Sequence, residues 1–116
     1  MAKATITVNG EPFTATLANT ESAHELAGLL PLTLRMDELN GNEKYAYLDQ
    51  VLTTAAERPG TIQAGDLMLF GDDCLVLFYE TFQTSYRYTR IGRIDDATGL
   101  AEAAGSGSVE VAWELA

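Results

Sequence analysis

Residues 4–17 read ATITVNGEPFTATL, two runs of alternating apolar and threonine side chains on either side of the Asn-Gly pair at 9–10. Alternation with a period of two is typical of a strand with one buried face, and Asn-Gly is a strong hairpin signal. A two-residue turn would pair Ile6 with Phe13, which places both side chains on one face. Pro12 fits this register because its missing N–H would point away from the partner strand.

The most apolar part of the chain is residues 67–79, LMLFGDDCLVLFY, in which a Gly-Asp-Asp turn separates two apolar runs. Such near-continuous apolarity is typical of strands that are covered on both faces. A further strand is expected over 86–94, where Gly92 would allow a bend or a close approach of another backbone. Three shorter runs, at 32–36, 45–47 and 109–115, also predict strands, which brings the total to eight.

Two short helices are expected between these strands. Residues 22–25 fit a capping box, with Asn19 or Thr20 as rival caps, and begin a helix over 22–30 that a proline ends. The second helix is expected over 96–104, with acids at its start and a glycine at its end. We interpret the Gly-Ser-Gly-Ser stretch that follows as a flexible connector.

Strands outnumber helices, so a parallel sheet of βαβ units is disfavoured. Eight strands can close into a barrel that side chains fill. We therefore predict a mainly β protein, a closed eight-stranded barrel whose open ends are capped by two short helices. We expect residues 1–116 to form one domain, since no internal repeat and no linker interrupts the pattern.

The charge balance argues against two classes of partner. Seven Lys and Arg stand against 17 Asp and Glu, for a net charge of −10. Nucleic acid and anionic membranes both need clustered cationic side chains, so we expect neither as a partner. The first eight residues already alternate as a strand, and we expect no signal peptide. A single cysteine suits a reducing compartment, which predicts a cytoplasmic location.

Four stretches carry a resemblance to a known family. They are LNGNEKYAYL at 39–48, PGTIQAGDLMLF at 59–70, CLVLFYETF at 74–82 and SYRYTRIGRID at 85–95. Together, and in their order along nearly the whole chain, they resemble the small bacterial cyclophilin-like proteins. The resemblance implies a minimal barrel related in fold to the cyclophilins, which are peptidyl-prolyl isomerases.

The resemblance also nominates one catalytic residue. Cyclophilins use an arginine in a Phe-His-Arg sequence on an early strand, and the matching strand here reads Leu34-Arg35-Met36. Arg35 is therefore the candidate catalytic residue, although the Phe and the His are absent and Trp113 does not match the family's pocket tryptophan. The alternative is that Arg35 is a surface residue that pairs with a nearby carboxylate.

The candidate ligand-binding residues are mostly aromatic. They are Tyr45, Tyr47, Met68, Phe78, Phe82, Tyr86 and Tyr88. Tyrosine combines an apolar body with a polar tip, which suits a groove for a peptide or a small molecule. The alternative is that Phe78 and half of the tyrosines fill the core. Alternation places Tyr86 and Tyr88 on one face without saying whether that face is core or groove.

Other reactive side chains are interpreted structurally. We expect His24 at the surface near a helix start and Cys74 as an inert buried thiol. One His and one Cys do not make a His/Cys zinc site, and the Asp pairs at 72–73 and 95–96 suit a turn and a helix start. We therefore expect no metal and no cofactor.

Three functions follow for a monomer or a homodimer. The first is a non-enzymatic binding module with an aromatic groove for a peptide segment or small molecule. The second is a weak prolyl isomerase that uses Arg35. The third is an assembly role through an exposed sheet edge.

Overall fold

The hairpin expected at the start of the chain forms as predicted. A computed structural model describes residues 2–116, with β1 at Lys3–Val8 and β2 at Glu11–Leu17. Ile6 pairs with Phe13 in the antiparallel register that the Asn-Gly turn predicts.

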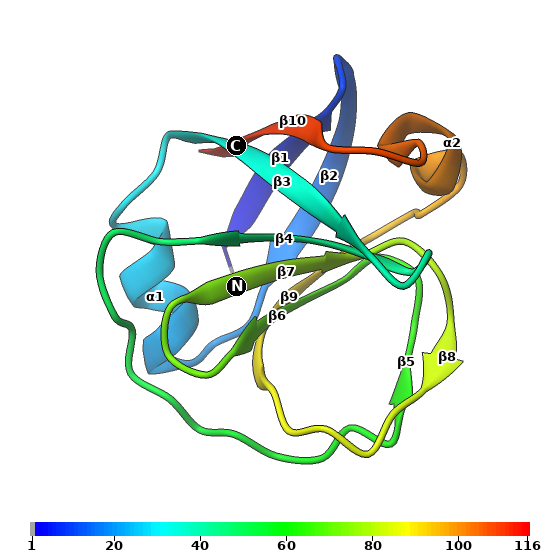
Figure 1. Cartoon of the computed structure of the whole chain (residues 1–116). Helices are drawn as coiled ribbons and strands as arrows, with labels where there is room; N and C mark the ends of the chain where they lie inside the picture. The colour runs from blue at the N-terminus through cyan, green and yellow to red at the C-terminus, as the bar shows by residue number, and fades with distance from the viewer. Residues whose placement is uncertain (1) are drawn as a thin grey trace.

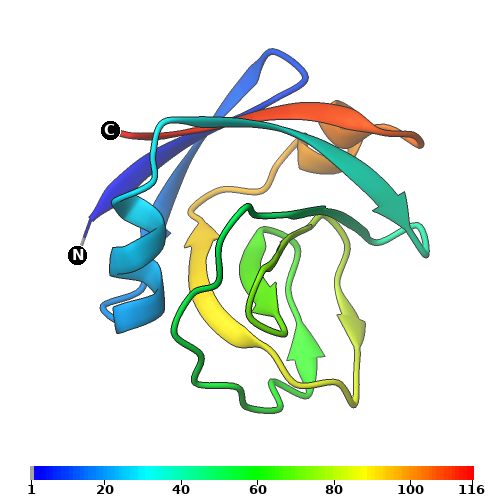
Figure 2. The ribbon, with the colours of Figure 1, turned by 60° about the vertical axis from the view of Figure 1, so that its left-hand side comes forward.

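The eight predicted strands close into one antiparallel barrel in the order β1-β10-β3-β4-β7-β6-β9-β2 (Figure 1). The remaining barrel strands are β3 (Leu32–Leu39), β4 (Glu43–Tyr47), β6 (Asp66–Phe70), β7 (Cys74–Phe78), β9 (Thr89–Ile94) and β10 (Val109–Leu115). Figure 2 shows β1, β2, β3 and β10 as one layer above the other four strands. The predicted fold class, a mainly β closed barrel with two short helices, is confirmed.

The two layers join at corners where strands change partners. At one corner β9 lies between β6 and β2, and Gly92 pairs with Leu67 of β6 on one side and with Leu17 of β2 on the other. A Cβ atom added to Gly92 would lie 2.5 Å from the carbonyl oxygen of Thr16, closer than real Cβ contacts come. The close approach expected at Gly92 is confirmed, and it explains why a glycine is needed there.

Strands β6 and β7 are buried on both faces, as their apolarity predicted. Leu75 and Leu77 point into the barrel, whereas Cys74, Val76 and Phe78 point outward. We call the two apolar clusters the inner core and the outer core. The outer core is made of Ile62, Met68, Cys74, Val76, Phe78 and Tyr88, with Tyr45 and Phe82 packed against it.

A second, two-stranded sheet contributes to the outer core. It consists of β5 (Thr61–Ile62) and β8 (Phe82–Gln83), which lie side by side at the lower right of Figure 1. Ile62 pairs with Phe82, and both pack into the outer core. The chain between 79 and 88 therefore folds back over the barrel's outer face.

Helix α1 (Glu21–Ala27) begins differently from one of its predictions. The cap is Thr20, whose hydroxyl accepts from the Ala23 N–H at 3.2 Å. The capping box at 22–25 is wrong, because tertiary contacts occupy both side chains: the Ser22 hydroxyl donates to the Thr53 carbonyl oxygen, and the Glu25 carboxylate accepts from Thr53.

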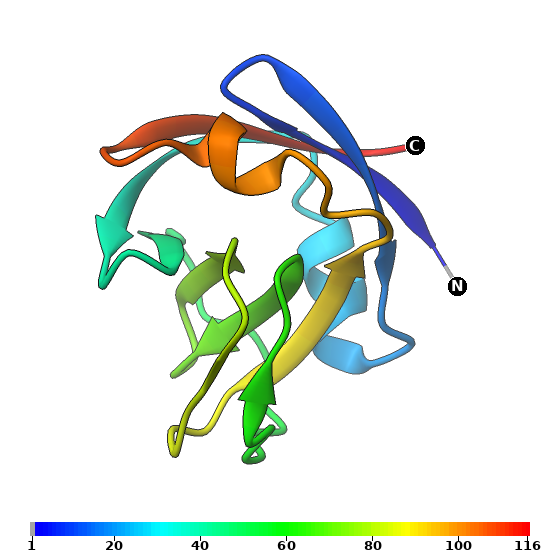
Figure 3. The same cartoon turned by 90° about the vertical axis from the view of Figure 1, so that its right-hand side faces the viewer.

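Helix α2 (Leu100–Ala104) is shorter than the expected 96–104. Asp96 accepts from the Thr98 N–H in a local turn, and Gly99 has φ +81°, so the helix starts only after it. Figure 3 shows α2, in orange, beside β10 and the β1–β2 hairpin. Leu26 of α1 and Leu100 of α2 are both buried in the inner core.

The strand expected over 86–94 is also shorter, since β9 begins at Thr89. Tyr88 instead makes an isolated bridge with Glu57, and Tyr86 lies in the preceding segment. The connector at 105–108 is not free of the barrel. The Lys44 ammonium donates to the carbonyl oxygens of Gly105 at 2.9 Å and Gly107 at 2.5 Å.

Candidate binding pocket

A pocket of about 470 Å³ opens on the outer face of β4, β6 and β7. It is lined by Leu39, Asn40, Glu43, Tyr45, Tyr47, Phe70, Cys74, Val76, Tyr86 and Tyr88. We call it the tyrosine pocket. Its volume lies within the range of about 300–1,000 Å³ that is usual for small-molecule sites.

Strand β4 supplies one wall through its alternation. Glu43, Tyr45 and Tyr47 share the outward face, while Lys44 between them is fully buried on the inward side. β7 supplies the floor, because Val76 pairs with Tyr45 and Cys74 pairs with Tyr47. The pleat of two adjacent strands thus sets a row of polar-tipped rings over an apolar base.

The opposite wall is aromatic as well. Phe70, at the end of β6, contacts Tyr86 edge to face at 6.1 Å between ring centroids and Tyr88 at 5.6 Å. Tyr88 in turn meets Phe78 edge to face at 5.4 Å. These ring pairs connect the exposed side chains Phe70 and Tyr86 to the buried rings of the outer core. The outer core therefore holds this wall of the pocket in place.

The rim leaves large apolar side chains in solvent. Six such residues are exposed within residues 2–116, and four of them line this pocket: Leu39, Tyr47, Phe70 and Tyr86. Single exposed apolar side chains are common and need no explanation, but a cluster around a concavity is typical of a binding site. Tyr47 is 66% exposed and Tyr86 64%, so neither contributes much to the core.

Glu43 is the one acidic residue of the pocket lining. Its side chain is 7% exposed, and among residues 2–116 its carboxylate has no hydrogen bond or ion pair in the structure. Burial, together with the nearby Glu38 carboxylate, raises the pKa of Glu43 to about 7. A buried, unpaired carboxyl group in the wall of a pocket is costly unless a partner arrives, and such groups mark functional sites.

Cys74 lies at the floor of the pocket and is buried, as expected. Burial, with Asp73 and Glu43 nearby, raises the pKa of its thiol to about 11. At neutral pH the group is therefore a thiol and not a thiolate, which makes it a poor nucleophile.

The structure divides the residues that were predicted to bind a ligand. Tyr45, Tyr47, Tyr86 and Tyr88 line the tyrosine pocket together. Met68 and Phe78 lie beneath it, fully buried in the outer core, and Phe82 packs against Phe78 at 5.6 Å between centroids. The core alternative thus describes Phe78 and also Tyr88, which is buried, while Tyr47 and Tyr86 stay exposed at the surface of the same cluster.

Sequence reasoning missed Glu43 and Phe70. A signal for Glu43 was present, because it alternates with Tyr45 and Tyr47 and must share their face. Phe70 could not be distinguished from the core-facing residues of its apolar strand.

Arg35 lies apart from these residues. It is exposed on the outward face of β3, opposite Glu110 of β10, and it does not line the tyrosine pocket. Leu39, the nearest pocket residue on the same strand, is four positions away, about 13 Å at 3.3 Å per residue. The isomerase hypothesis requires Arg35 beside the aromatic groove, and the fold does not bring the two together.

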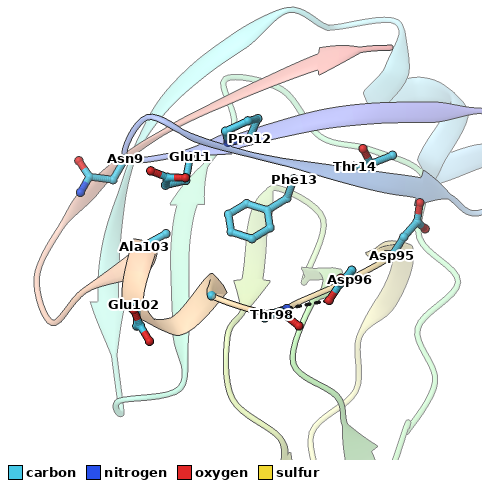
Figure 4. Close-up of a pocket in the computed structure, with 11 residues that line it drawn as sticks. Asn9, Glu11, Pro12, Phe13, Thr14, Asp95, Asp96, Thr98, Glu102 and Ala103 are labelled. Atoms are coloured by element: carbon cyan, nitrogen blue, oxygen red, sulfur yellow. Dashed lines mark hydrogen bonds between the residues drawn. The ribbon is translucent and has the colours of Figure 1, made fainter.

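A larger pocket of about 700 Å³ lies between β2 and the segment that leads into α2. Phe13 points into this space, as Figure 4 shows. Two of the four acidic residues in its lining are engaged within the fold: Asp95 accepts from Lys3 and from Thr16, and Asp96 accepts from the Thr98 N–H. Its lining holds one aromatic side chain among residues 2–116, against five in the tyrosine pocket.

The outer face of a closed barrel thus carries an aromatic pocket over a second apolar core. The family model of the cyclophilin-like family matches residues 6–114. The chain belongs to the cyclophilin-like family. The match spans both walls of the tyrosine pocket, so the pocket is built from the cyclophilin-like domain itself. No curated protein and no solved structure matches the chain.

Two further observations concern residues 2–116. None of the helices described there is long and apolar enough to cross a membrane. Within the same residues, no three or more His, Cys, Asp or Glu side chains lie together in a way that could hold a metal ion.

Proposed function

We propose that this cyclophilin-like domain is a binding module whose tyrosine pocket holds a small molecule or a single side chain of a peptide. The observation that carries the proposal is the coincidence of four exposed apolar side chains with one concave site. Exposure of Tyr47 and Tyr86 does not stabilise the fold, so the cluster is better explained by a ligand that covers it.

The chemistry of the pocket favours binding over catalysis. Its thiol is held protonated, and among residues 2–116 no histidine or basic residue lines it. Tyrosine rings offer apolar area together with hydroxyl groups that can hydrogen-bond a ligand at its edge. A cytoplasmic location is part of the same proposal and is supported by the single cysteine.

The two rival functions have less support. The isomerase hypothesis needs Arg35 at the proline pocket, and Arg35 lies exposed on β3, four residues before Leu39 and outside the tyrosine pocket. The assembly hypothesis needs an open sheet edge. Each barrel strand described here has a neighbour on both sides, and the remaining strands, β5 and β8, have two residues each.

A ligand screen tests the proposal. Aromatic fragments and short blocked peptides that contain Phe, Tyr or Pro are added to the protein, and the midpoint of thermal unfolding is measured. A ligand that binds only the folded state raises this midpoint. We expect hits whose effect is lost in Tyr47→Ala.

The matched control is Val51→Ala. Val51 is also 66% exposed, but it does not line the tyrosine pocket. Hits should persist in this variant. A screen without hits, or hits that both variants retain, would contradict the proposal.

A further inference from the structure

We propose that the ligand of the tyrosine pocket is an organic cation, an ammonium group on a small apolar body, held between the Glu43 carboxylate and the tyrosine rings. This inference rests on the proposed function of the pocket and names the chemical class of its ligand. The geometry that carries it is a buried acid, without a partner among residues 2–116, in the wall of an aromatic pocket.

Residues 2–116 do not supply a cation to Glu43. Among them, no Lys, Arg or His lines the tyrosine pocket. Lys44 is the sequence neighbour of Glu43, but it points into the barrel, where it donates to Glu38 at 2.8 Å and lies 5.3 Å from the centre of the Tyr79 ring. Arg90 and Arg93 lie beside Asp66. The carboxylate is therefore open to a charge from outside.

The rest of the lining suits the same ligand. The faces of tyrosine and phenylalanine rings carry partial negative charge and attract cations, most strongly where water is excluded. The rings of Tyr45 and Tyr47 are nearly perpendicular, at 84°, so the wall presents both a ring face and a ring edge. A net charge of −10 also draws cations toward the protein and repels anions.

Burial of Glu43 has a measurable consequence for binding. The titratable groups near it are all acids or weak acids: Glu38 on β3, Cys74 on β7, Tyr45 on its own strand, Tyr79 and Tyr88. None of them neutralises its charge. Because the pKa of Glu43 is raised to about 7, a bound ammonium group should lower it and release part of a proton near neutral pH.

Three probes of the same size test the inference. They are phenethylamine, 2-phenylethanol and phenylacetate, which share one aromatic body and carry a positive, a neutral and a negative group. Each is titrated into the isotopically labelled protein, and the dissociation constant is taken from the shifts of backbone amide signals. We expect the amine to bind roughly tenfold more tightly than the alcohol. Phenylacetate should bind most weakly.

Glu43→Gln is the decisive variant, since it keeps the shape of the side chain and removes its charge. It should abolish the preference for the amine and leave the alcohol's affinity within about twofold. The control Glu114→Gln makes the same substitution at an exposed position outside the pocket, and it should retain the preference. Calorimetry in buffers of different ionisation enthalpy should detect proton release on amine binding to the wild type and to Glu114→Gln, and none on binding to Glu43→Gln.

The outcomes separate the two proposals. If none of the probes, and no compound in the earlier screen, perturbs the pocket, the binding function itself fails. If alcohol and amine bind equally in the wild type, or Glu43→Gln keeps the preference, the pocket binds ligands but the cation inference is wrong.

Discussion

Glu43 and Lys44 are neighbours on one strand and both are buried, yet they face opposite sides of β4 and differ in whether their charges have partners. Inside the barrel, the Lys44 ammonium donates to the Glu38 carboxylate and to two carbonyl oxygens. Outside, the Glu43 carboxylate has no partner among residues 2–116 and opens on the tyrosine pocket. A buried charge with all its bonds made serves the fold, whereas one left without bonds indicates a site.

Glu38 and Glu43 show the same contrast in the direction of their pKa shifts. Burial would raise the pKa of Glu38, but hydrogen bonds from Lys44, Tyr79 and the Gly41 N–H outweigh it and lower that pKa. Glu43 has burial without those bonds, and its pKa rises. On the inward face of β4, Lys44 and Glu38 thus have hydrogen-bond partners. On the outward face, the Glu43 carboxylate has none among residues 2–116.

The largest effect is expected from removing the buried bonds of Lys44. Lys44→Met leaves Glu38 without its cation and the carbonyls of Gly105 and Gly107 without their donor. Because removing one partner of a buried pair strands the other, the free energy of unfolding should fall by about 3–5 kcal/mol. Urea denaturation followed by circular dichroism measures it.

Lys3→Met is the matched control. Lys3 pairs with Asp95 at 2.9 Å, but both side chains are largely exposed, so stability should hardly change. Equal losses of unfolding free energy in the two variants would show that the buried bonds of Lys44 stabilise the fold no more than the exposed ion pair of Lys3.

Apolar residues on the two faces should also differ. Leu75 is fully buried in the inner core, and Leu75→Ala should cost about 2–5 kcal/mol of stability through the cavity it leaves. Tyr86 is 64% exposed on the pocket rim, and Tyr86→Ala should cost about 1 kcal/mol or less. Chemical denaturation of both variants compares them, and a cost for Tyr86→Ala as large as that for Leu75→Ala would make the rim part of the core.

A smaller effect is expected from pH. The pKa of Glu43 rises from an ordinary 4.5 to about 7 on folding, so the folded state holds the proton more tightly than the unfolded chain. The contribution of this group to stability is therefore present below about pH 4.5 and is lost as the pH rises toward 7. Glu43→Gln should gain stability over the wild type by on the order of 1–3 kcal/mol between about pH 5 and 8. A stability difference that does not vary with pH, measured by denaturation across that range, would contradict the burial of this charge.

The smallest effect is expected at Arg35. It is exposed and outside the tyrosine pocket, so Arg35→Ala should leave both unfolding and ligand binding within error of the wild type. Exchange between cis and trans forms of an X-Pro peptide, followed by NMR at high protein concentration, completes the test. Acceleration by the wild type that Arg35→Ala removes would restore the isomerase hypothesis.

Local sequence patterns were enough to predict much of the fold. The hairpin register followed from one Asn-Gly turn and the face that Ile6 and Phe13 must share. The close approach at Gly92 followed from the need for a residue without Cβ. The start of α1 did not follow, because Ser22 and Glu25 bond to Thr53, about 30 residues away in sequence.

The candidate site was predicted only in part. Four tyrosines of the predicted set line the pocket, while Met68 and Phe78 support it from below. The two faces of β6 and β7 are equally apolar in sequence, so alternation cannot say which face closes inside the barrel and which stays open.

By itself, the sequence determined the existence of the eight barrel strands, the barrel class and the aromatic composition of the site, since these depend on period-two alternation, turn chemistry and residue type. Only the tertiary structure decided that the segment 79–88 folds back over β6 and β7, which buries Phe78 and leaves Tyr86 and Tyr47 at the rim. It also decided that Lys44 is satisfied and Glu43 is not. The burial of Phe78 and the pairing of Lys44 both depend on contacts between segments far apart in the chain, which no local pattern predicts.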